Sequence, residues 1–279
     1  MAKRKLKAKR ILLTGASSGI GYALAQQLVA KGNEILVVAR REQRLSALQE
    51  ATNECAGTIH CLAGDITCGD FRAEIFQWVD TQWDSTLDVL INNAGIGSHQ
   101  AFADSKPEYL RQIMDVNVIA PLELIRGHLQ HLRRAQSPVI CNVGSVLGHV
   151  ALPGNSEYCA SKFALHGFSD ALRAELSNEQ IDVVLVSPST TKTEFFDSLL
   201  AGPQAGKSDK GMSVEIVARK IVRAIEKGTR ESILSWKALL GVWQDRIFPS
   251  LMSRQLANWY QRKSKSSSAA SAKQREKVV

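Results

Sequence analysis

Three side chains in the middle of the chain have types and a spacing that could transfer a proton. Tyr158 and Lys162 stand four residues apart, and Ser145 lies thirteen residues before the tyrosine. Residues i and i+4 share one face of a helix, so this spacing predicts an ammonium group beside a phenol. A neighbouring cation favours the phenolate and lowers the pKa of a phenol from about 10. A phenol tuned in this way, beside a hydroxyl donor, can polarise a carbonyl and protonate it.

Such a pair needs support from the surrounding elements, because tyrosine and lysine at this spacing are common on solvated helices. Apolar runs predict strands at 11–14, 34–39, 58–62, 87–91, 139–143, 182–187 and 232–235. Helical patterns fall between them at 22–30, 44–55, 71–83, 108–132, 156–176 and 214–227, with a bend expected at Pro121. The alternation predicts one α/β domain over 10–235, a doubly wound Rossmann fold of about seven parallel strands with helices on both faces.

The two ends of the chain depart from this alternation. Aromatic and aliphatic residues recur at helical spacing over 236–262 and predict a C-terminal amphipathic helical extension, which Pro249 breaks or kinks. Three interpretations of this extension stay open: a cap on the pocket, a subunit interface, or a contact with a membrane surface. Residues 1–9 are expected to form a basic N-terminal tail, and residues 263–279 a disordered basic tail.

Charge and cysteine content narrow the class of protein. The net charge is +8, but the basic residues gather in the two tails and leave about −3 for the rest of the chain. A basic tail can contact anionic lipid or nucleic acid, but a solvated charge run that aids solubility is the favoured interpretation. Nothing resembles a nucleic-acid-binding module, so we expect no nucleic acid partner. Five cysteines without a C-x-x-C pair predict neither a disulfide framework nor a metal site. No apolar stretch reaches the ~18 residues of a membrane span, so the expectation is a cytoplasmic protein.

A glycine-rich stretch, T-G-A-S-S-G-I-G at 14–21, stands between the first predicted strand and the first predicted helix. In this context a glycine loop binds a dinucleotide. Gly15 allows a tight turn, while Gly19 and Gly21 allow the backbone to approach the ligand closely. The amides at the start of the helix would then face the pyrophosphate.

The residue that reads the adenosine ribose is expected at the end of the second strand. An acid there would favour NAD, but this chain has Arg40 and Arg41. Guanidinium groups suit a 2′-phosphate, so the sequence predicts NADP, with NAD less favoured. Asp65 follows the third strand and could accept a hydrogen bond from the adenine amino group. The sequence N-N-A-G at 92–95 follows the fourth strand at the same edge of the sheet.

Together these motifs resemble the short-chain dehydrogenase/reductase family, specifically an NADP-preferring, carbonyl reductase-like member. The glycine motif, Asp65, N-N-A-G, Asn117, Ser145, Tyr158 and Lys162 follow one another in the family's order over residues 10 to about 235. The resemblance implies that Tyr158 is the general acid or base and that Ser145 orients the carbonyl oxygen. It also implies that Lys162 holds the nicotinamide ribose and lowers the pKa of Tyr158, and that Asn117 holds a water of a proton relay.

The resemblance also implies which residues contact the dinucleotide and the substrate. The dinucleotide set comprises Thr14, Gly15, Ser17, Ser18, Gly19, Ile20, Gly21, Arg40, Arg41, Asp65, Ile66, Asn93, Ala94, Gly95, Tyr158, Lys162, Pro188, Thr191 and Thr193. The substrate set comprises Ser145, His149, Tyr158 and Phe195. One departure from the family pattern is Ser189, which replaces a glycine after Pro188 and would be strained if its φ were positive.

Residues 189–212 occupy the place of the family's variable substrate lid, and their phenylalanine and leucine residues predict an apolar, lipid-like carbonyl compound. The leading hypothesis is an NADP-dependent oxidoreductase that interconverts a carbonyl and a secondary alcohol. One alternative is a hydroxysteroid or retinol-type alcohol dehydrogenase, and another is a non-catalytic dinucleotide-binding redox sensor or scaffold. The resemblance further implies a homodimer or homotetramer formed through helices 108–132 and 156–176.

Overall fold

The sheet that carries the molecule has seven parallel strands in the order β3-β2-β1-β4-β5-β6-β7. The computed structural model describes residues 4–196, 199–202 and 211–276. The strands are β1 Arg10–Thr14, β2 Glu34–Ala39, β3 Thr58–Ala63, β4 Val89–Asn92, β5 Val139–Val143, β6 Asp182–Ser187 and β7 Glu231–Ile233. The chain runs outward from β1 to β3 and then crosses back to β4, which places a switch in strand order between β1 and β4. The predicted doubly wound fold is confirmed.

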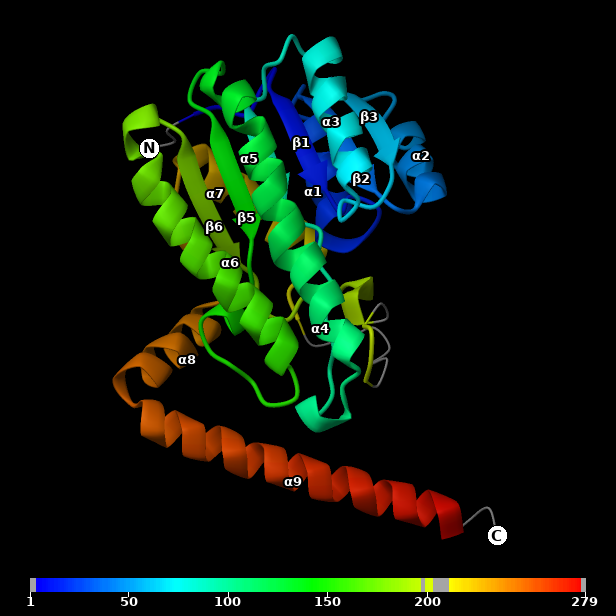
Figure 1. The fold of residues 1–279 in the computed structure, drawn as a ribbon, viewed down its shortest axis with the longest axis vertical. Helices are drawn as coiled ribbons and strands as arrows, with labels where there is room; N and C mark the ends of the chain where they lie inside the picture. Colours follow the sequence, from blue (N-terminus) through cyan, green and yellow to red (C-terminus); the bar gives the residue numbers. More distant parts are fainter. Residues whose placement is uncertain (1–3, 197–198, 203–210, 277–279) are drawn as a thin grey trace.

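Helices cover both faces of this sheet (Figure 1). They are α1 Gly19–Val29, α2 Glu42–Glu50, α3 Gly69–Gln82, α4 Pro107–Met114, α5 Ala120–Arg133, α6 Ser156–Glu175 and α7 Val214–Lys227. Side chains of α1, α2 and α7 form one buried apolar cluster with the sheet. Side chains of α3, α5 and α6 form a second cluster on the opposite face.

The strand sequences explain why two cores form. Ile11 and Leu13 of β1 belong to one cluster, and Leu12 between them belongs to the other. Successive strand residues point to opposite faces, so a continuous apolar run fills both cores at once. The sheet is thereby held rigidly in place, and the loops at its carboxyl edge start from fixed positions.

The predicted helix over 108–132 is not one continuous helix. A π-helical segment, Asp115–Ile119, separates α4 from α5, and Pro121 lies in the first turn of α5. Proline has no N–H and cannot donate to the carbonyl of Asn117 four residues earlier. The register therefore shifts: the N–H of Ala120 bonds to the carbonyl of Asp115, five residues back. The π turn lies just before Pro121, where a bend was expected, and Asn117 stands within it.

The prediction of a free basic N-terminal tail is wrong for residues 4–9. Leu6 is buried in the first cluster, and the Arg4 guanidinium donates to the Ile225 carbonyl at 2.7 Å and pairs with Asp182. The Lys9 ammonium lies 2.7 Å from a carboxylate oxygen of Asp88. The body of the protein supplies buried acceptors for these cations, which a count of charges along the sequence does not reveal.

Two helices follow the sheet: α8 Trp236–Ile247 and α9 Pro249–Glu276. The predicted break at Pro249 is confirmed. Helix α9 continues to Glu276, through part of the range 263–279 for which a disordered tail was predicted; this stretch has no glycine or proline before Glu276. Helix α9 extends away from the sheet, past the edge where the strands end (Figure 1). Among the described residues, none of these helices is long and apolar enough to cross a membrane.

Candidate active site

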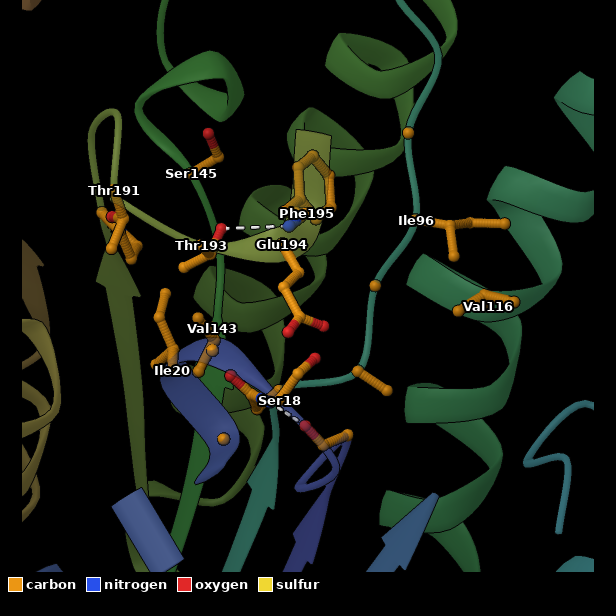
Figure 2. Close-up of a pocket in the computed structure, with 18 of the residues that line it drawn as sticks. Ser18, Ile20, Ile96, Val116, Val143, Ser145, Thr191, Thr193, Glu194 and Phe195 are labelled. Atoms are coloured by element: carbon orange, nitrogen blue, oxygen red, sulfur yellow. Dashed lines mark hydrogen bonds between the residues drawn. The ribbon is translucent and has the colours of Figure 1, made fainter. Parts of the chain in front are cut away.

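A cavity of about 1070 Å³ lies at the carboxyl edge of the sheet. In open α/β sheets, ligands bind in the crevice where the strand order reverses. The loops after β1, β2, β3, β4, β5 and β6 all contribute to its wall, and most of the predicted site residues therefore meet there. Figure 2 shows the loop that carries Ser145, the start of α1 with Ser18 and Ile20, and the segment Thr191–Phe195 around this space.

The glycine loop after β1 is fixed by contacts that only glycine permits. Gly15 has φ +71°, and a Cβ there would stand 2.8 Å from the Cα of Ala94. A Cβ on Gly21 would stand 2.2 Å from the carbonyl oxygen of Gly15. Helix α1 begins at Gly19, so its first unpaired N–H groups and its positive dipole end face the cavity. The loop is a ready site for a pyrophosphate.

Two predicted cofactor residues, Thr14 and Asn93, form hydrogen bonds that hold this loop against the loop after β4. The Thr14 hydroxyl accepts hydrogen bonds from the backbone N–H groups of Asn93 and Ala94, each at 3.0 Å. The Asn93 amide donates to the carbonyls of Thr14 and Gly15. Thr14, a predicted coenzyme contact, is buried and is not among the residues that line the cavity, whereas Asn93, Ala94 and Gly95 line it.

The arginines after β2 differ from one another in their contacts. Arg41 Nη2 donates to Ser18 Oγ at 2.6 Å and to Ser17 Oγ at 2.9 Å, which holds its guanidinium over the glycine loop. Arg40 lines the cavity and is exposed. Arg44, one turn into α2, lies 2.5 Å from Glu194 Oε2, and Arg41 Nη1 lies 3.4 Å from the same oxygen. These ion pairs lower the pKa of Glu194, chiefly through Arg44.

At the far side of this pocket, Asp65 and Ile66 line the wall after β3. Asp65 Oδ1 accepts from the N–H and the hydroxyl of Thr67, at 2.9 and 2.8 Å. The carboxylate is therefore oriented by its own loop and keeps its second oxygen for another donor.

The three residues with proton-transfer chemistry meet at the other end of the cavity. Tyr158, Lys162 and Ser145 all line it. The Lys162 ammonium donates to the Val143 carbonyl at 3.0 Å and lies 5.7 Å from the centre of the Tyr158 ring. The Ser145 side chain accepts the N–H of Leu147 at 3.1 Å, which makes Ser145 the cap of a short 3₁₀ turn, Val146–Gly148.

The expectation that Lys162 lowers the pKa of Tyr158 is wrong in this structure. Burial raises the pKa of Tyr158 to about 12, although a hydrogen bond with Ser145 works in the opposite direction. Burial likewise lowers the pKa of Lys162 to about 8. The Lys162 ammonium is turned toward the Val143 carbonyl, so desolvation dominates both groups. The phenol is consequently protonated at neutral pH and can act as a proton donor.

Asn117 is fully buried in the π segment and lies behind the cavity wall. Its side-chain oxygen accepts the N–H of Ile96 at 2.9 Å, and its amide donates to the Ile96 carbonyl and to Ser161 Oγ, both at 2.9 Å. The side chain thus joins the loop after β4 to α6, one residue from Lys162. The register shift described above gives this asparagine its position.

The loop after β6 supplies the remaining wall. Pro188, Thr191, Thr193 and Phe195 line the cavity, and the Phe195 ring centre lies 5.6 Å from that of Tyr158. Ser189 is not among the residues with positive φ, so the strain expected there does not occur. Figure 2 shows the Glu194 side chain pointing from this segment toward Ser18. Residues 197–198 and 203–210 of the expected lid lie outside the described residues.

His149 is not in the cavity, so its predicted role in the substrate pocket is wrong. The side chain is buried on the other side of the Ser145 loop, where Nε2 lies 2.8 Å from Ser187 Oγ. His149 is the C-cap of the 3₁₀ turn that Ser145 begins. Leu147 and Leu152 of the same segment do line the cavity.

Sequence reasoning missed several residues that shape the site. Glu157 is buried and accepts from Ser98 Oγ and Ser105 Oγ, both at 2.6 Å, which fastens the loop after β4 to α6 beside Tyr158. Arg44 and Glu194 were also missed. Arg44 could have been predicted, because it follows Arg41 by three residues and residues at this spacing lie on the same face of a helix. No sequence signal identifies the partners of Glu157.

Known proteins resemble this chain along most of its length. Residues 9–204 match the family model described as short chain dehydrogenase. An uncharacterized oxidoreductase of Staphylococcus saprophyticus is 32% identical over 76% of this chain and 82% of its own length. The dehydrogenase/reductase SDR family protein 7-like of Drosophila melanogaster is 31% identical over 89% of this chain and 79% of its own length.

Solved structures agree with the sequence relatives. A short-chain dehydrogenase from Sphingobium yanoikuyae in complex with NADPH superposes with a TM-score of 0.74 at 27% identity, over 86% of this chain and 95% of that one. A short-chain dehydrogenase from Streptomyces avermitilis gives 0.76 at 27% identity, over 93% and 99%. With its glycine loop, its seven-stranded sheet and these relatives, the chain belongs to the short-chain dehydrogenase/reductase family of oxidoreductases.

Proposed function

We propose that the protein is an NADP-dependent oxidoreductase that interconverts a carbonyl compound and a secondary alcohol. The observation that carries this proposal is the meeting of Tyr158, Ser145 and Lys162 at one end of a cavity whose other end is a dinucleotide loop. A proton donor is thereby placed along the same cavity as the expected nicotinamide. Bound nicotinamide supplies the hydride, and the protein supplies position, charge and the proton.

The preference for NADP is argued from the arginines after β2. Arg41 is held over the glycine loop by Ser17 and Ser18, and Arg44 stands beside it. Both guanidinium groups share the carboxylate of Glu194, so this corner of the cavity already accommodates a negative charge. A 2′-phosphate is a stronger acceptor for such groups than a ribose hydroxyl. The NADPH held by the Sphingobium relative is in line with this proposal.

In the reductive direction Tyr158 donates its proton to the carbonyl oxygen, and Ser145 hydrogen-bonds that oxygen. The high pKa of Tyr158 keeps the phenol protonated until the oxygen gains negative charge. The Lys162 ammonium would hold the ribose hydroxyls and stabilise the phenolate left behind. Asn117 positions the loop after β4 against α6, and so helps to hold Lys162 in its position on α6.

The substrate is proposed to be an apolar, lipid-like ketone or aldehyde. The wall near Tyr158 includes the apolar residues Val146, Leu147, Leu152, Phe195 and Leu199, beside the polar His99 and Asn155. An apolar wall binds by excluding water, with few polar groups fixing the orientation. Reduction is the proposed direction, because the protonated phenol is a donor.

A spectrophotometric assay tests these proposals together. The full chain is mixed with NADPH or NADH and a panel of ketones and aldehydes graded from charged to apolar, and loss of the reduced coenzyme is followed. We expect turnover with NADPH on the apolar members, and loss of activity by about 100- to 10,000-fold in Tyr158→Phe with NADPH binding unchanged. Equal rates for the wild type and Tyr158→Phe would refute the role of Tyr158. NADPH binding without turnover of any carbonyl or alcohol would favour a redox sensor.

A second proposal concerns the C-terminal helices, which we assign to an anionic membrane surface. Large apolar side chains are exposed along α8 and the start of α9: Trp236, Leu240, Trp243, Ile247, Phe248 and Leu251. Lys237, Arg246 and Arg254 lie among them, and exposed tryptophan beside basic residues is typical of helices that lie in a lipid interface.

Vesicle flotation with and without phosphatidylserine tests this assignment. The double variant Trp243→Ala, Ile247→Ala should lose binding to anionic vesicles, and Phe102→Ala, an exposed apolar residue elsewhere, should not. If the double variant floats as the wild type does, the helices serve another purpose. A shift of the double variant from dimer to monomer in solution would assign them to a subunit interface instead.

A further inference from the structure

A cluster of metal-ligating side chains lies on the outer side of the Ser145 loop, away from the cavity. His149 follows the 3₁₀ turn, His166 lies on α6, and Glu231 begins β7. One coordinating atom from each lies within 4.8 Å of those of the other two. The three residues are far apart in the sequence, so no spacing motif predicts the cluster, and it forms only in the folded protein.

His149 is the buried member, and one of its nitrogens has no hydrogen-bond partner. Its Nε2 lies 2.8 Å from Ser187 Oγ. Its Nδ1 is buried without a hydrogen bond, and faces Glu231 Oε1 at 3.3 Å. Burial of an unsatisfied polar atom destabilises a protein, so a buried nitrogen without a hydrogen bond that faces a carboxylate requires an explanation. A cation between the two atoms would satisfy both.

His166 is held in the orientation that a metal ligand needs. Its Nδ1 lies 3.0 Å from the Gly148 carbonyl, which can only accept, so the proton resides on Nδ1 and Nε2 keeps its lone pair. A histidine that binds a metal almost always donates its other N–H to a carbonyl, a carboxylate or water. His149, with Nε2 on Ser187, and His166, with Nδ1 on Gly148, both have this outer contact.

Other charged groups near the cluster are mostly engaged elsewhere. Asp170 lies 3.6 Å from His166 Nε2, but Arg173 and Arg230 also contact its carboxylate. Arg246 of α8 is close enough to act on His149. Among the described residues, Glu231 is the carboxylate that contacts His149 directly, at 3.3 Å from Nδ1.

We propose that His149, His166 and Glu231 form a binding site for a divalent transition metal ion of the zinc class. Two imidazoles and one carboxylate are a donor set that suits Zn²⁺, with water in the remaining position. His166 and Glu231 are partly exposed, so an ion can enter from solvent. The site is separate from the proton-transfer residues and takes no part in hydride transfer.

Occupation of this site would stiffen the Ser145 loop. The N–H of Val146 bonds to the Pro188 carbonyl, and Gly148 and His149 complete the turn that Ser145 caps. A metal bound by His149, His166 and Glu231 ties this turn to α6 and to β7 at the edge of the sheet. Binding should therefore raise the unfolding temperature of the whole domain.

Cobalt binding tests the proposal on the full chain, with any affinity tag removed. Co²⁺ is titrated into the protein, visible d–d absorption is recorded, and Zn²⁺ is then added as a competitor. We expect one Co²⁺ per chain, displaced by Zn²⁺, and a rise in unfolding temperature with Zn²⁺. His166→Gln and Glu231→Gln should each weaken binding by at least about tenfold. Neither residue is fully buried, so both variants are expected to fold, which circular dichroism checks.

The matched control is another histidine–glutamate pair, His60 and Glu34, whose atoms lie 2.9 Å apart on the opposite side of the sheet. His60→Gln should bind Co²⁺ as the wild type does. Equal binding by the wild type, His166→Gln and Glu231→Gln would overturn the proposal, and so would a wild type that binds no stoichiometric Co²⁺. Loss of binding in His60→Gln but not in Glu231→Gln would show that the metal binds to His60 and Glu34 instead, and would overturn the proposal.

Discussion

The two ends of the cavity are built in different ways. At the dinucleotide end, glycines make backbone contacts that leave no space for a side chain, and the buried Thr14 and half-buried Asn93 side chains hold the loops together. At the substrate end, much of the wall is formed by apolar side chains from the loops after β5 and β6, including Leu147, Phe195 and Leu199. Substitution of a tightly packed glycine displaces the backbone, whereas one apolar side chain of the wall can be replaced by another with little displacement. The two ends should therefore respond differently to substitution.

The largest effect is expected from Gly21→Ala. The new Cβ would lie 2.2 Å from the Gly15 carbonyl oxygen, so the backbone of the glycine loop must move. A displacement near 1 Å at a binding site can cost about 100-fold, and we expect NADPH affinity to fall at least that far, for every substrate alike. Tryptophan fluorescence quenching by NADPH measures it.

Gly167→Ala is the matched control for this substitution, because nothing lies within 4 Å of its added Cβ. Alanine in an α6 interior position should stabilise the helix by up to about 1 kcal/mol and leave NADPH affinity unchanged. Equal NADPH affinities for Gly21→Ala and the wild type would show that the glycine loop accommodates a side chain. The two ends of the cavity would then not differ in their tolerance of substitution.

Arg41→Ala should be next in size. Removal of a hydrogen-bonded charge partner costs about 1.5–3 kcal/mol, which corresponds to about 10- to 100-fold in the Kd for NADPH. NADH should be little affected, because it has no 2′-phosphate. Arg40→Ala is the comparison, since no side chain holds Arg40 over the glycine loop among the contacts described, and its effect should be smaller. Isothermal titration of both coenzymes distinguishes a specific phosphate contact from a general loss of positive charge.

The pH dependence of turnover tests the proton-transfer residues, which lie where the two ends meet. With a pKa of about 8, Lys162 is charged below that pH and loses its charge above it. Tyr158 keeps its proton throughout, because its pKa is about 12. Reductive kcat should thus be level near neutrality and fall about tenfold per pH unit well above pH 8. Lys162→Arg, which stays charged, should remove this fall, and a profile that declines equally in Lys162→Arg would assign it to another group.

The smallest effect is expected at the substrate end. Leu199→Ala removes part of the apolar wall and should raise KM for a bulky apolar ketone about three- to tenfold, with little change for a small one. NADPH affinity should not move. Steady-state kinetics on two ketones of different size measures this selectivity, and an equal loss on both substrates would mean that Leu199 supports the fold of the segment instead.

The sequence predicted the architecture because its signals are local. Continuous apolar runs such as 34–39 define the strands, and glycines at 15, 19 and 21 require the close contacts that the structure has. What the sequence did not predict depends on the direction of side chains. His149 was a candidate for the cavity, but it does not line it and its Nε2 lies 2.8 Å from Ser187 Oγ. The burial that raises the pKa of Tyr158 likewise depends on the assembled walls.

The basic residues near the N-terminus also show that sequence patterns do not reveal which distant residues a side chain contacts. Arg4 and Lys9 appear in the sequence as part of a charge run, yet Asp182 and Asp88 receive them in the fold. Acceptors that lie far away in the sequence cannot be found by inspection of the run itself. For the same reason the grouping of His149, His166 and Glu231 becomes visible only in three dimensions.

The ion pairs of Glu194 have a consequence for the order of events in a catalytic cycle. Glu194 belongs to the segment beside the substrate wall, but it forms ion pairs with Arg41 and Arg44 at the coenzyme end. An exposed pair of this kind is worth about 0–1 kcal/mol, so an arriving phosphate can displace the carboxylate easily. The released segment is then free to rearrange around the substrate. Coenzyme should accordingly enter first and leave last, and product-inhibition kinetics in which NADP competes with NADPH alone would reveal that sequence.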